Sequence, residues 1–246
     1  MGLPALLVAI LVIEVVLARQ QPGVPFVPPS QGAQQYGTGL LLEYVVLGDS
    51  TAVGQGAPYE RGIAVSTARH LAARGRRVRM VNLAVSGATA GDVVALQLDR
   101  AARRRPDVVL VAVGANDATR PHRPGTVRAD VETIVERLVG ADCAVRIVLT
   151  GSPALGGVRV AAQPLRALLG VLGERMNEDA FAPVVAMRPN VTFAPIARRT
   201  GAAFRRDPSL FAADGFHPNE RGYATWRPVL ERAIDEALAR DPGSCS

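Results

Sequence analysis

Three side chains in the sequence are of the types that acyl transfer requires: a hydroxyl nucleophile, a base and a carboxylate that orients the base. Ser50 follows the apolar run 45–47 in a Gly-Asp-Ser turn, a pattern typical of a serine carried to the carboxyl end of a buried strand. His217 lies three residues after Asp214 in a turn that contains Gly and Pro, so the carboxylate can reach the imidazole. Each pattern also has an ordinary explanation, as a surface turn or as a helix start capped by Asn219.

The sequence offers three histidines as candidates for the base. His70 lies on a helical stripe with Thr67 and Leu71, which favours a packed helix position. His122 lies in a segment rich in Arg and Pro, which predicts an exposed loop. His217 is therefore the strongest candidate for the base.

Five continuous apolar runs predict strands, and continuous rather than alternating runs are typical of parallel strands covered on both faces. These runs lie at 44–47, 78–83, 108–113, 145–150 and 191–195. Segments with helical spacing follow them or lie between them, at 59–74, 92–104, 127–139, 165–176 and 220–240. The alternation predicts an α/β domain over residues 41–241, with three α/β/α layers around a five-stranded parallel sheet.

Four motifs in this order resemble the four sequence blocks of the SGNH hydrolase superfamily, the GDSL-type esterases and lipases. The blocks here are Gly48-Asp49-Ser50-Thr51, the Asn-x-x-x-Ser-Gly stretch ending at Gly87, Gly114-x-Asn116-Asp117, and Asp214-x-x-His217. Thr51 stands where the family usually has Leu. The resemblance covers about residues 44–240 and implies the flavodoxin-like fold of that superfamily.

The resemblance also implies roles for individual residues. Ser50 would be the nucleophile, His217 the general base, and Asp214 the carboxylate that orients the imidazole. The backbone N–H groups of Ser50 and Gly87, with the side-chain amide of Asn116, would form the oxyanion hole. No metal and no cofactor is implied.

The residue types fit these roles. Gly87 has no side chain that would keep a substrate from its N–H group, and Asn116 offers an uncharged donor. Asp49 and Asp117 are interpreted as structural, holding loops by hydrogen bonds to the backbone.

Composition and missing motifs argue against other classes. All 28 basic residues are arginines and the net charge is +6, but no aromatic residues interleave with them, so we expect solvated arginines and no nucleic-acid partner. With no lysine, a phosphate-binding P-loop is excluded. An α/β-hydrolase would need a Gly-x-Ser-x-Gly elbow, which the chain lacks at Ser50. A non-catalytic tethered binding domain remains an alternative of another class.

The N-terminal segment predicts a signal peptide or membrane anchor at 1–19, because residues 3–18 are almost wholly apolar. The run is shorter than a bilayer core requires, and Glu14 interrupts it. Arg19 follows the run, which by the positive-inside rule conflicts with export. We nevertheless expect an extracytoplasmic protein, secreted or attached to a membrane through residues 3–18. Residues 20–40 predict a Pro/Gly/Gln-rich linker, and 242–246 a short tail.

The sequence indicates the type of reaction more narrowly than it indicates the class of substrate. We expect a serine esterase acting on lipid-like or short-chain acyl esters, with an O-deacetylase of carbohydrates as the alternative. The loop 152–163, rich in Ala, Gly and Val, favours a small or apolar acyl pocket. Two cysteines, Cys143 and Cys245, allow one disulfide in an oxidising compartment, but the sequence does not indicate whether they pair, nor the oligomeric state.

Overall fold

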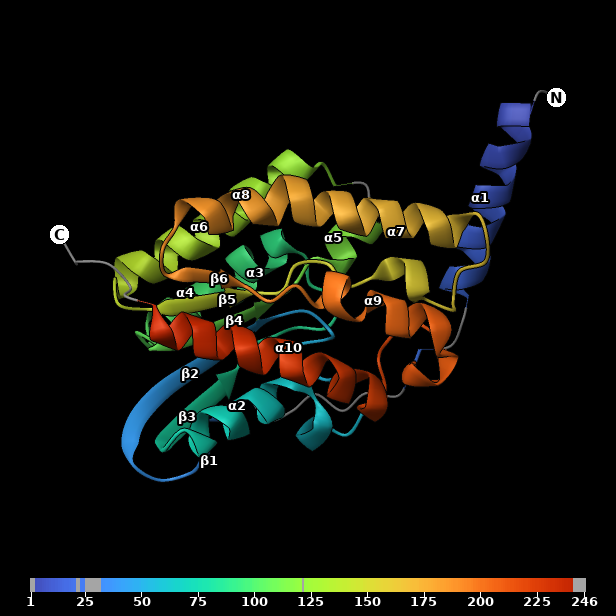
Figure 1. Cartoon of the computed structure of the whole chain (residues 1–246). Helices are drawn as coiled ribbons and strands as arrows, with labels where there is room; N and C mark the ends of the chain where they lie inside the picture. The colour runs from blue at the N-terminus through green and yellow to red at the C-terminus, as the bar shows by residue number, and fades with distance from the viewer. Residues whose placement is uncertain (1–2, 21–22, 25–31, 121, 241–246) are drawn as a thin grey trace.

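A mixed sheet of six strands lies between two layers of helices in the computed structural model, which describes residues 3–20, 23–24, 32–120 and 122–240 (Figure 1). The strands are β1 (Gln34–Tyr36), β2 (Leu40–Gly48), β3 (Arg76–Asn82), β4 (Val108–Ala112), β5 (Arg146–Leu149) and β6 (Val191–Phe193). Their order across the sheet is β1-β3-β2-β4-β5-β6. Without β1, this is the flavodoxin-like order, and the five predicted strands and the three layers are confirmed.

The sheet has one strand more than the sequence predicts. β1 pairs antiparallel with β3, with Gln34 opposite Met80 and Tyr36 opposite Val78. It lies in the stretch predicted as a linker at 20–40. β1 has three residues, two of them Gln, so it forms no apolar run and gives no periodic signal in the sequence. It is a strand because it pairs with β3.

The parallel strands are covered on both faces, as their continuous apolar runs predict. All five residues of β4 are buried, and so are residues 44–48 of β2. Tyr44 is fully buried and its hydroxyl shares a hydrogen bond with the Thr67 hydroxyl at 2.7 Å. This arrangement satisfies the one polar atom that the Tyr44 side chain brings into the core.

Helices cover the two faces in separate groups (Figure 1). One group packs around the last helix and comprises α2 (Ile63–Ala73), α9 (Ile196–Arg206) and α10 (Glu220–Ala239). The other group comprises α3 (Ala90–Leu96), α4 (Leu98–Ala102), α6 (Pro124–Ala141) and α8 (Ala182–Met187). The helix predicted at 92–104 is in fact broken at Gln97, and that predicted at 59–74 begins with a separate 3₁₀ turn, Tyr59–Arg61.

A long helical run follows the sheet's β5 strand. It consists of α7 (Leu165–Met176), a turn of π-helix at Asn177–Phe181, and then α8. The π-turn places the Asn177 amide against the loop after β5, where its Oδ1 accepts the Ser152 N–H at 2.7 Å and its Nδ2 donates to the Ser152 carbonyl at 2.9 Å. The loop is thereby attached to the helix through both backbone groups of one residue.

The N-terminal helix α1 (Leu3–Arg19) extends from one end of the molecule, near the start of α7 (Figure 1). Leu11 and Val15 pack against the core, and the Glu14 carboxylate accepts the Leu165 N–H at 2.8 Å. Most of its other large apolar side chains are exposed. Within the described ranges, we find no helix with the length and apolar character needed to cross a membrane.

Candidate active site

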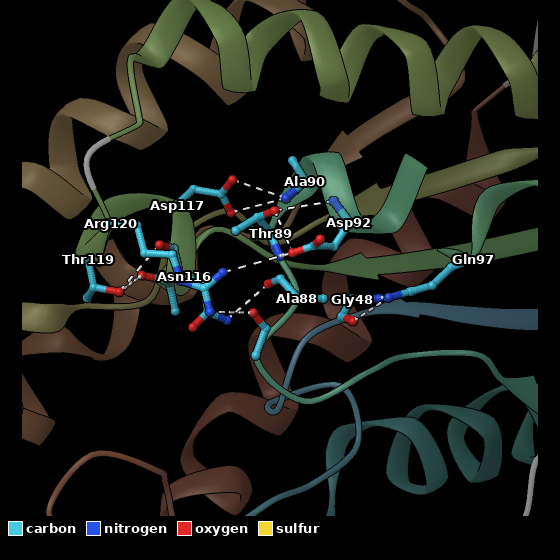
Figure 2. Close-up of polar contacts among 12 residues, drawn as sticks. Gly48, Ala88, Thr89, Ala90, Asp92, Gln97, Asn116, Asp117, Thr119 and Arg120 are labelled. Atoms are coloured by element: carbon cyan, nitrogen blue, oxygen red, sulfur yellow. Dashed lines mark hydrogen bonds and ion pairs between the residues drawn. The ribbon is translucent and has the colours of Figure 1, made fainter. Parts of the chain in front are cut away.

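A tight turn at the end of β2 places Ser50 at the carboxyl edge of the sheet. Gly48 has φ of +136°, and a Cβ atom there would lie 1.9 Å from the Ala112 carbonyl oxygen, so the approach of β2 to β4 requires glycine. The side-chain amide of Gln97 pairs with both the N–H and the C=O of Gly48 at 2.9 Å (Figure 2). The next residue, Asp49, donates its N–H to Ala112 at 3.0 Å, and Ser50 follows it directly.

The Asp49 carboxylate holds the turn from inside. Its Oδ1 accepts the N–H and the hydroxyl of Thr51, each at 2.8 Å. Complete burial raises the pKa of Asp49 to about 6, although the two hydrogen bonds from Thr51 oppose this change. The interpretation of Asp49 as a structural residue agrees with these contacts.

A second turn brings together Asp214 and His217. The Asp214 Oδ1 atom accepts the backbone N–H groups of Phe216 and His217, both at 3.0 Å. Its Oδ2 atom lies 2.6 Å from His217 Nδ1. Gly215, with φ of +65°, allows the chain to reverse inside this turn. The predicted pairing of these two side chains is therefore present.

The electrostatics of this pair favour an ionised carboxylate. Burial raises the pKa of Asp214, but the hydrogen bonds from the His217 ring and from two backbone N–H groups together outweigh it, and the pKa lies below its ordinary value. An ionised carboxylate next to Nδ1 favours the tautomer that carries its proton there. The His217 Nε2 atom is then the ring nitrogen that can accept a proton.

The loop after β3 and the helix after β4 meet at the same edge (Figure 2). Gly87 lies in this loop with φ of +81°. From α5 (Ala115–Thr119), the Asn116 Nδ2 donates to the Ala88 carbonyl at 3.0 Å. The Asp117 carboxylate accepts the Ala90 N–H at 3.0 Å, as expected for a structural residue. Since an amide has two N–H groups, Asn116 keeps a second donor in a fixed direction.

Close packing brings the Ser50 turn against the His217 turn. A Cβ atom at Gly56 would lie 2.4 Å from the Pro218 carbonyl oxygen and 3.0 Å from His217 Cβ. The segment that follows Ser50 therefore lies directly on the histidine turn.

A small apolar cavity links the same elements. The cavity is lined by His217, by Thr51, which follows the serine, and by Ala115, which precedes Asn116. Residues adjacent to two predicted site positions thus share one cavity wall with the predicted base. The loops after β2 and β4 and the turn before α10 (Glu220–Ala239) converge at one edge of the sheet.

Gln55, which no sequence motif predicts as a site residue, connects the site to the body of the protein. Its N–H donates to the Ser50 carbonyl at 2.9 Å, and its Oε1 accepts the Ser86 hydroxyl at 2.6 Å. Its carbonyl accepts the Tyr223 hydroxyl of α10 at 2.7 Å. A single Gln in a Gly-containing turn carries no motif, so no sequence signal pointed to this role.

The other two histidines lie where the sequence places them. The side chain of His70, on α2, is 14% exposed, and its Nε2 lies 2.9 Å from Asp235 Oδ1 of α10. His122 is exposed in a loop. In the part of the chain that the structure describes, no group of three or more His, Cys, Asp or Glu side chains is arranged to hold a metal ion.

Comparisons with known proteins agree with the geometry. The model of the GDSL-like Lipase/Acylhydrolase family matches residues 46–225, a range that contains all five predicted site residues. A GDSL-like esterase of Mycobacterium tuberculosis is 34% identical over 203 residues, which cover 80% of this chain and 63% of that protein. The chain spans less than two thirds of the length of the curated relatives it matches.

Solved structures share the fold at low sequence identity. A family 3 carbohydrate esterase of Clostridium thermocellum is similar with a TM-score of 0.61 and 16% identity, over 81% of this chain and 98% of that one. A phospholipase A1 of Streptomyces albidoflavus gives a TM-score of 0.58 and 19% identity, over 78% and 99%. These likenesses establish the fold and not the substrate.

The raised pKa of Asp49 predicts a pH dependence of stability. Because the pKa of Asp49 is about 6 in the folded protein and about 3.9 in an unfolded chain, the folded state binds the carboxyl proton of Asp49 more tightly than the unfolded state does. The free energy of unfolding should therefore fall as pH rises from about 4 to about 6, by at most about 3 kcal/mol from this group. Asp49→Asn, which keeps an acceptor for Thr51, should remove that decrease.

Urea unfolding of both proteins at pH 4, 5, 6 and 7.5 measures the effect. Asp99→Asn is the matched control, because the Asp99 side chain is 69% exposed and should leave the profile unchanged. Parallel profiles for the parent protein and Asp49→Asn would contradict the assignment.

Proposed function

We propose that the chain, which belongs to the GDSL-like lipase/acylhydrolase family, is an ester hydrolase with Ser50, His217 and Asp214 as its catalytic triad. The observation that carries this proposal is the 2.6 Å contact between Asp214 and His217 Nδ1, in a turn packed against the segment that follows Ser50. The contact orients the ring so that Nε2 is the base.

The reaction then proceeds in two halves. His217 Nε2 takes the hydroxyl proton of Ser50 while the serine oxygen attacks the ester carbonyl carbon. The tetrahedral intermediate collapses, the protonated imidazole gives its proton to the departing alcohol, and an acyl-enzyme remains. Water, deprotonated by the same nitrogen, attacks the acyl-enzyme and releases the carboxylic acid and the free serine.

The negative charge on the carbonyl oxygen needs donors that are already in place. We assign this role to the backbone N–H groups of Ser50 and Gly87 and to the second amide N–H of Asn116. The other amide N–H of Asn116 donates to the Ala88 carbonyl. This bond supports the assignment because it fixes the orientation of the Asn116 side chain.

Substitution of these residues should separate chemistry from folding. Ser50→Ala and His217→Ala should nearly abolish hydrolysis of p-nitrophenyl acetate. Asn116→Ala should lower kcat on the order of 10²–10³-fold, the usual effect of removing one oxyanion donor. Circular dichroism and thermal melting check that each variant is folded.

His122→Ala is the matched control, since this histidine lies exposed in a loop and should leave kcat unchanged. A folded Ser50→Ala protein with full activity would exclude the mechanism. An inactive parent protein across all esters would favour the non-catalytic binding domain instead.

The acyl group that we favour is short. The apolar cavity beside His217 has a volume of about 20 Å³, close to that needed by one water molecule. The loop 152–163 forms one part of the cavity wall, with Leu155 and Val158. Aromatic side chains form another part: Phe204, Phe211, Phe216 and Trp226. This size suits a methyl group better than an alkyl chain.

The same feature favours a second candidate function. A carbohydrate O-deacetylase also transfers an acetyl group, and the cavity places no limit on the alcohol that leaves. A panel of substrates with one acyl group and different alcohols distinguishes the two functions.

Activity should fall as the acyl chain lengthens. We expect kcat/KM for p-nitrophenyl acetate to exceed that for the octanoate ester at least about 10-fold, because forcing extra methylenes into a closely packed cavity costs about 1–3 kcal/mol. Leu155→Ala, which enlarges the cavity, should shift the preference toward butyrate, and Leu168→Ala on the exposed face of α7 should not. Acetylated xylose in the panel tests the second candidate function. Preference for octanoate or longer esters would refute the short-acyl assignment and favour lipid substrates.

We further infer that the protein works outside the cytoplasm, attached to a membrane surface through residues 3–18. The support is the exposed apolar surface of α1, which includes Leu6, Leu7, Val8, Val12, Ile13, Val16 and Leu17. The charge of Glu14 is engaged by Leu165. Cys143 is disulfide-bonded, as expected in an oxidising compartment; Cys245 and the tail at 242–246 lie outside the described residues.

Membrane attachment should depend on the apolar face of α1. The full chain should co-sediment with liposomes of phosphatidylcholine and phosphatidylglycerol, and Leu7→Asp with Ile13→Asp should reduce the bound fraction about 10-fold or more, given the cost of placing charge in the interface. Leu96→Asp, a 57% exposed apolar residue elsewhere, is the control. In cells, Cys143 should resist maleimide before reduction. Equal sedimentation of both variants would contradict the proposal.

A further inference from the structure

The loop that carries Gly87 is attached to α5 by side chains that act on its backbone (Figure 2). Asn116 and Asp117 hold peptide groups that follow Gly87 in the chain. A third side chain is that of Arg120, which follows α5 directly. Its Nη2 atom donates a hydrogen bond to the Gly87 carbonyl oxygen at 2.9 Å. Arg120 therefore makes the contact nearest to the proposed oxyanion donor.

Besides the turn closed by the Ala88 N–H, which donates to the Val85 carbonyl at 3.1 Å, Gly87 has open space on its side-chain side. If a Cβ atom is built at Gly87, the one atom of the described chain that lies within 4 Å beyond its neighbours is Arg120 Nη2, at 3.8 Å. The two preceding residues, Val85 and Ser86, are exposed. Because glycine has more backbone freedom than any other residue, the direction of this peptide depends on the hydrogen bonds that hold it.

Arg120 also reaches the start of α3. Its Nη1 atom lies 3.9 Å from Asp92 Oδ2. The same oxygen accepts the N–H and the hydroxyl of Thr89, at 2.9 Å and 2.8 Å, and so caps the helix. The guanidinium group thus spans from the Gly87 carbonyl to a fixed helix end. The two Nη atoms of the guanidinium group approach the two acceptors separately, whereas an ammonium group would have to reach both from one nitrogen.

The ion pair between Arg120 and Asp92 matters less in this arrangement than the hydrogen bond from Arg120 to Gly87. The side chains of Arg120 and Asp92 are both 44% exposed, and exposed ion pairs contribute little to stability. The hydrogen bond to Gly87 fixes a peptide plane instead. We therefore expect loss of Arg120 to affect the geometry of the loop more than the stability of the fold.

We propose that Arg120 is a positioning residue that keeps the Gly87 N–H directed at the oxyanion. By holding the Gly87 carbonyl, it fixes the peptide plane that follows the Gly87 α-carbon. The peptide that carries the Gly87 N–H precedes this carbon, so its direction relative to the fixed plane is left to φ and ψ of Gly87 alone. The inference rests on the function proposed above, in which this N–H is one of three donors. Arg120 acts through Gly87 and does not touch the substrate.

Three substitutions test the role: Arg120→Ala, Arg120→Lys and Arg120→Gln. With p-nitrophenyl acetate, we expect Arg120→Ala to lower kcat about 10–100-fold, somewhat less than removal of a donor itself, with KM changed less than about twofold. Lys keeps the charge and Gln keeps one donor, so each should recover only part of the rate. Arg128→Ala is the matched control, because Arg128 forms an exposed pair with Glu132 on α6.

Two readouts distinguish positioning from a merely structural role. The Ki of a trifluoromethyl ketone, whose adduct with serine carries an oxyanion, should rise by the same factor as kcat falls, since both report transition-state binding. Methylguanidinium added to Arg120→Ala should restore part of the rate and should not affect Asn116→Ala. Active-site titration with a fluorophosphonate corrects each rate for the fraction of folded enzyme.

The outcomes are separable. If Arg120→Ala and Arg120→Gln retain the kcat and the ketone Ki of the parent enzyme, the positioning role is refuted while the serine mechanism stands. If the rate falls only in proportion to the titrated active fraction, Arg120 is structural and the proposal is equally refuted. If Arg120→Ala does not fold, Arg120→Lys and Arg120→Gln decide by the same two readouts. Failure of the proposed function is a different result, seen as full activity in Ser50→Ala.

Discussion

The parallel pairing of β2 with β3 on one side and β4 on the other is the constraint on which the site depends. The register places Val46 opposite Asn82 and Gly48 opposite Ala112. Because all three strands end at the same edge, the loops after neighbouring strands start only about 5 Å apart. A shift of one residue in either pairing would turn every side chain of a strand to the other face, and the loops would start from different heights.

The loops at this edge are held mainly by polar side chains bonded to backbone groups. Gln97, Asn116 and Asp117 each bond to a backbone group of another element at this edge, and the Asp214 carboxylate closes its own turn. Such contacts fix a backbone without bulky packing next to it. The edge is therefore well ordered and still has room for a substrate.

The sequence specifies the centre of the fold better than its margins. The five parallel strands follow from continuous apolar runs, whereas β1 is short and polar and exists through its pairing with β3. Helical spacing does not predict the break at Gln97, where the side chain bonds to Gly48, far away in the chain. The Asp214-x-x-His217 spacing predicted a contact that forms. Arg120 carried no signal among 28 arginines, since its role depends on which carbonyl it reaches.

The amide of Gln97 gives Gly48 the two hydrogen bonds that another strand residue would otherwise give. The junction between α3 and α4 thereby supplies backbone hydrogen bonds to the sheet, and it does so at the residue two positions before the serine. A change at residue 97 would therefore remove the acceptor of the buried Gly48 N–H and alter the start of the glycine turn, whatever the chemistry of the substrate. A side chain between two helices thus helps to decide where the central strand ends.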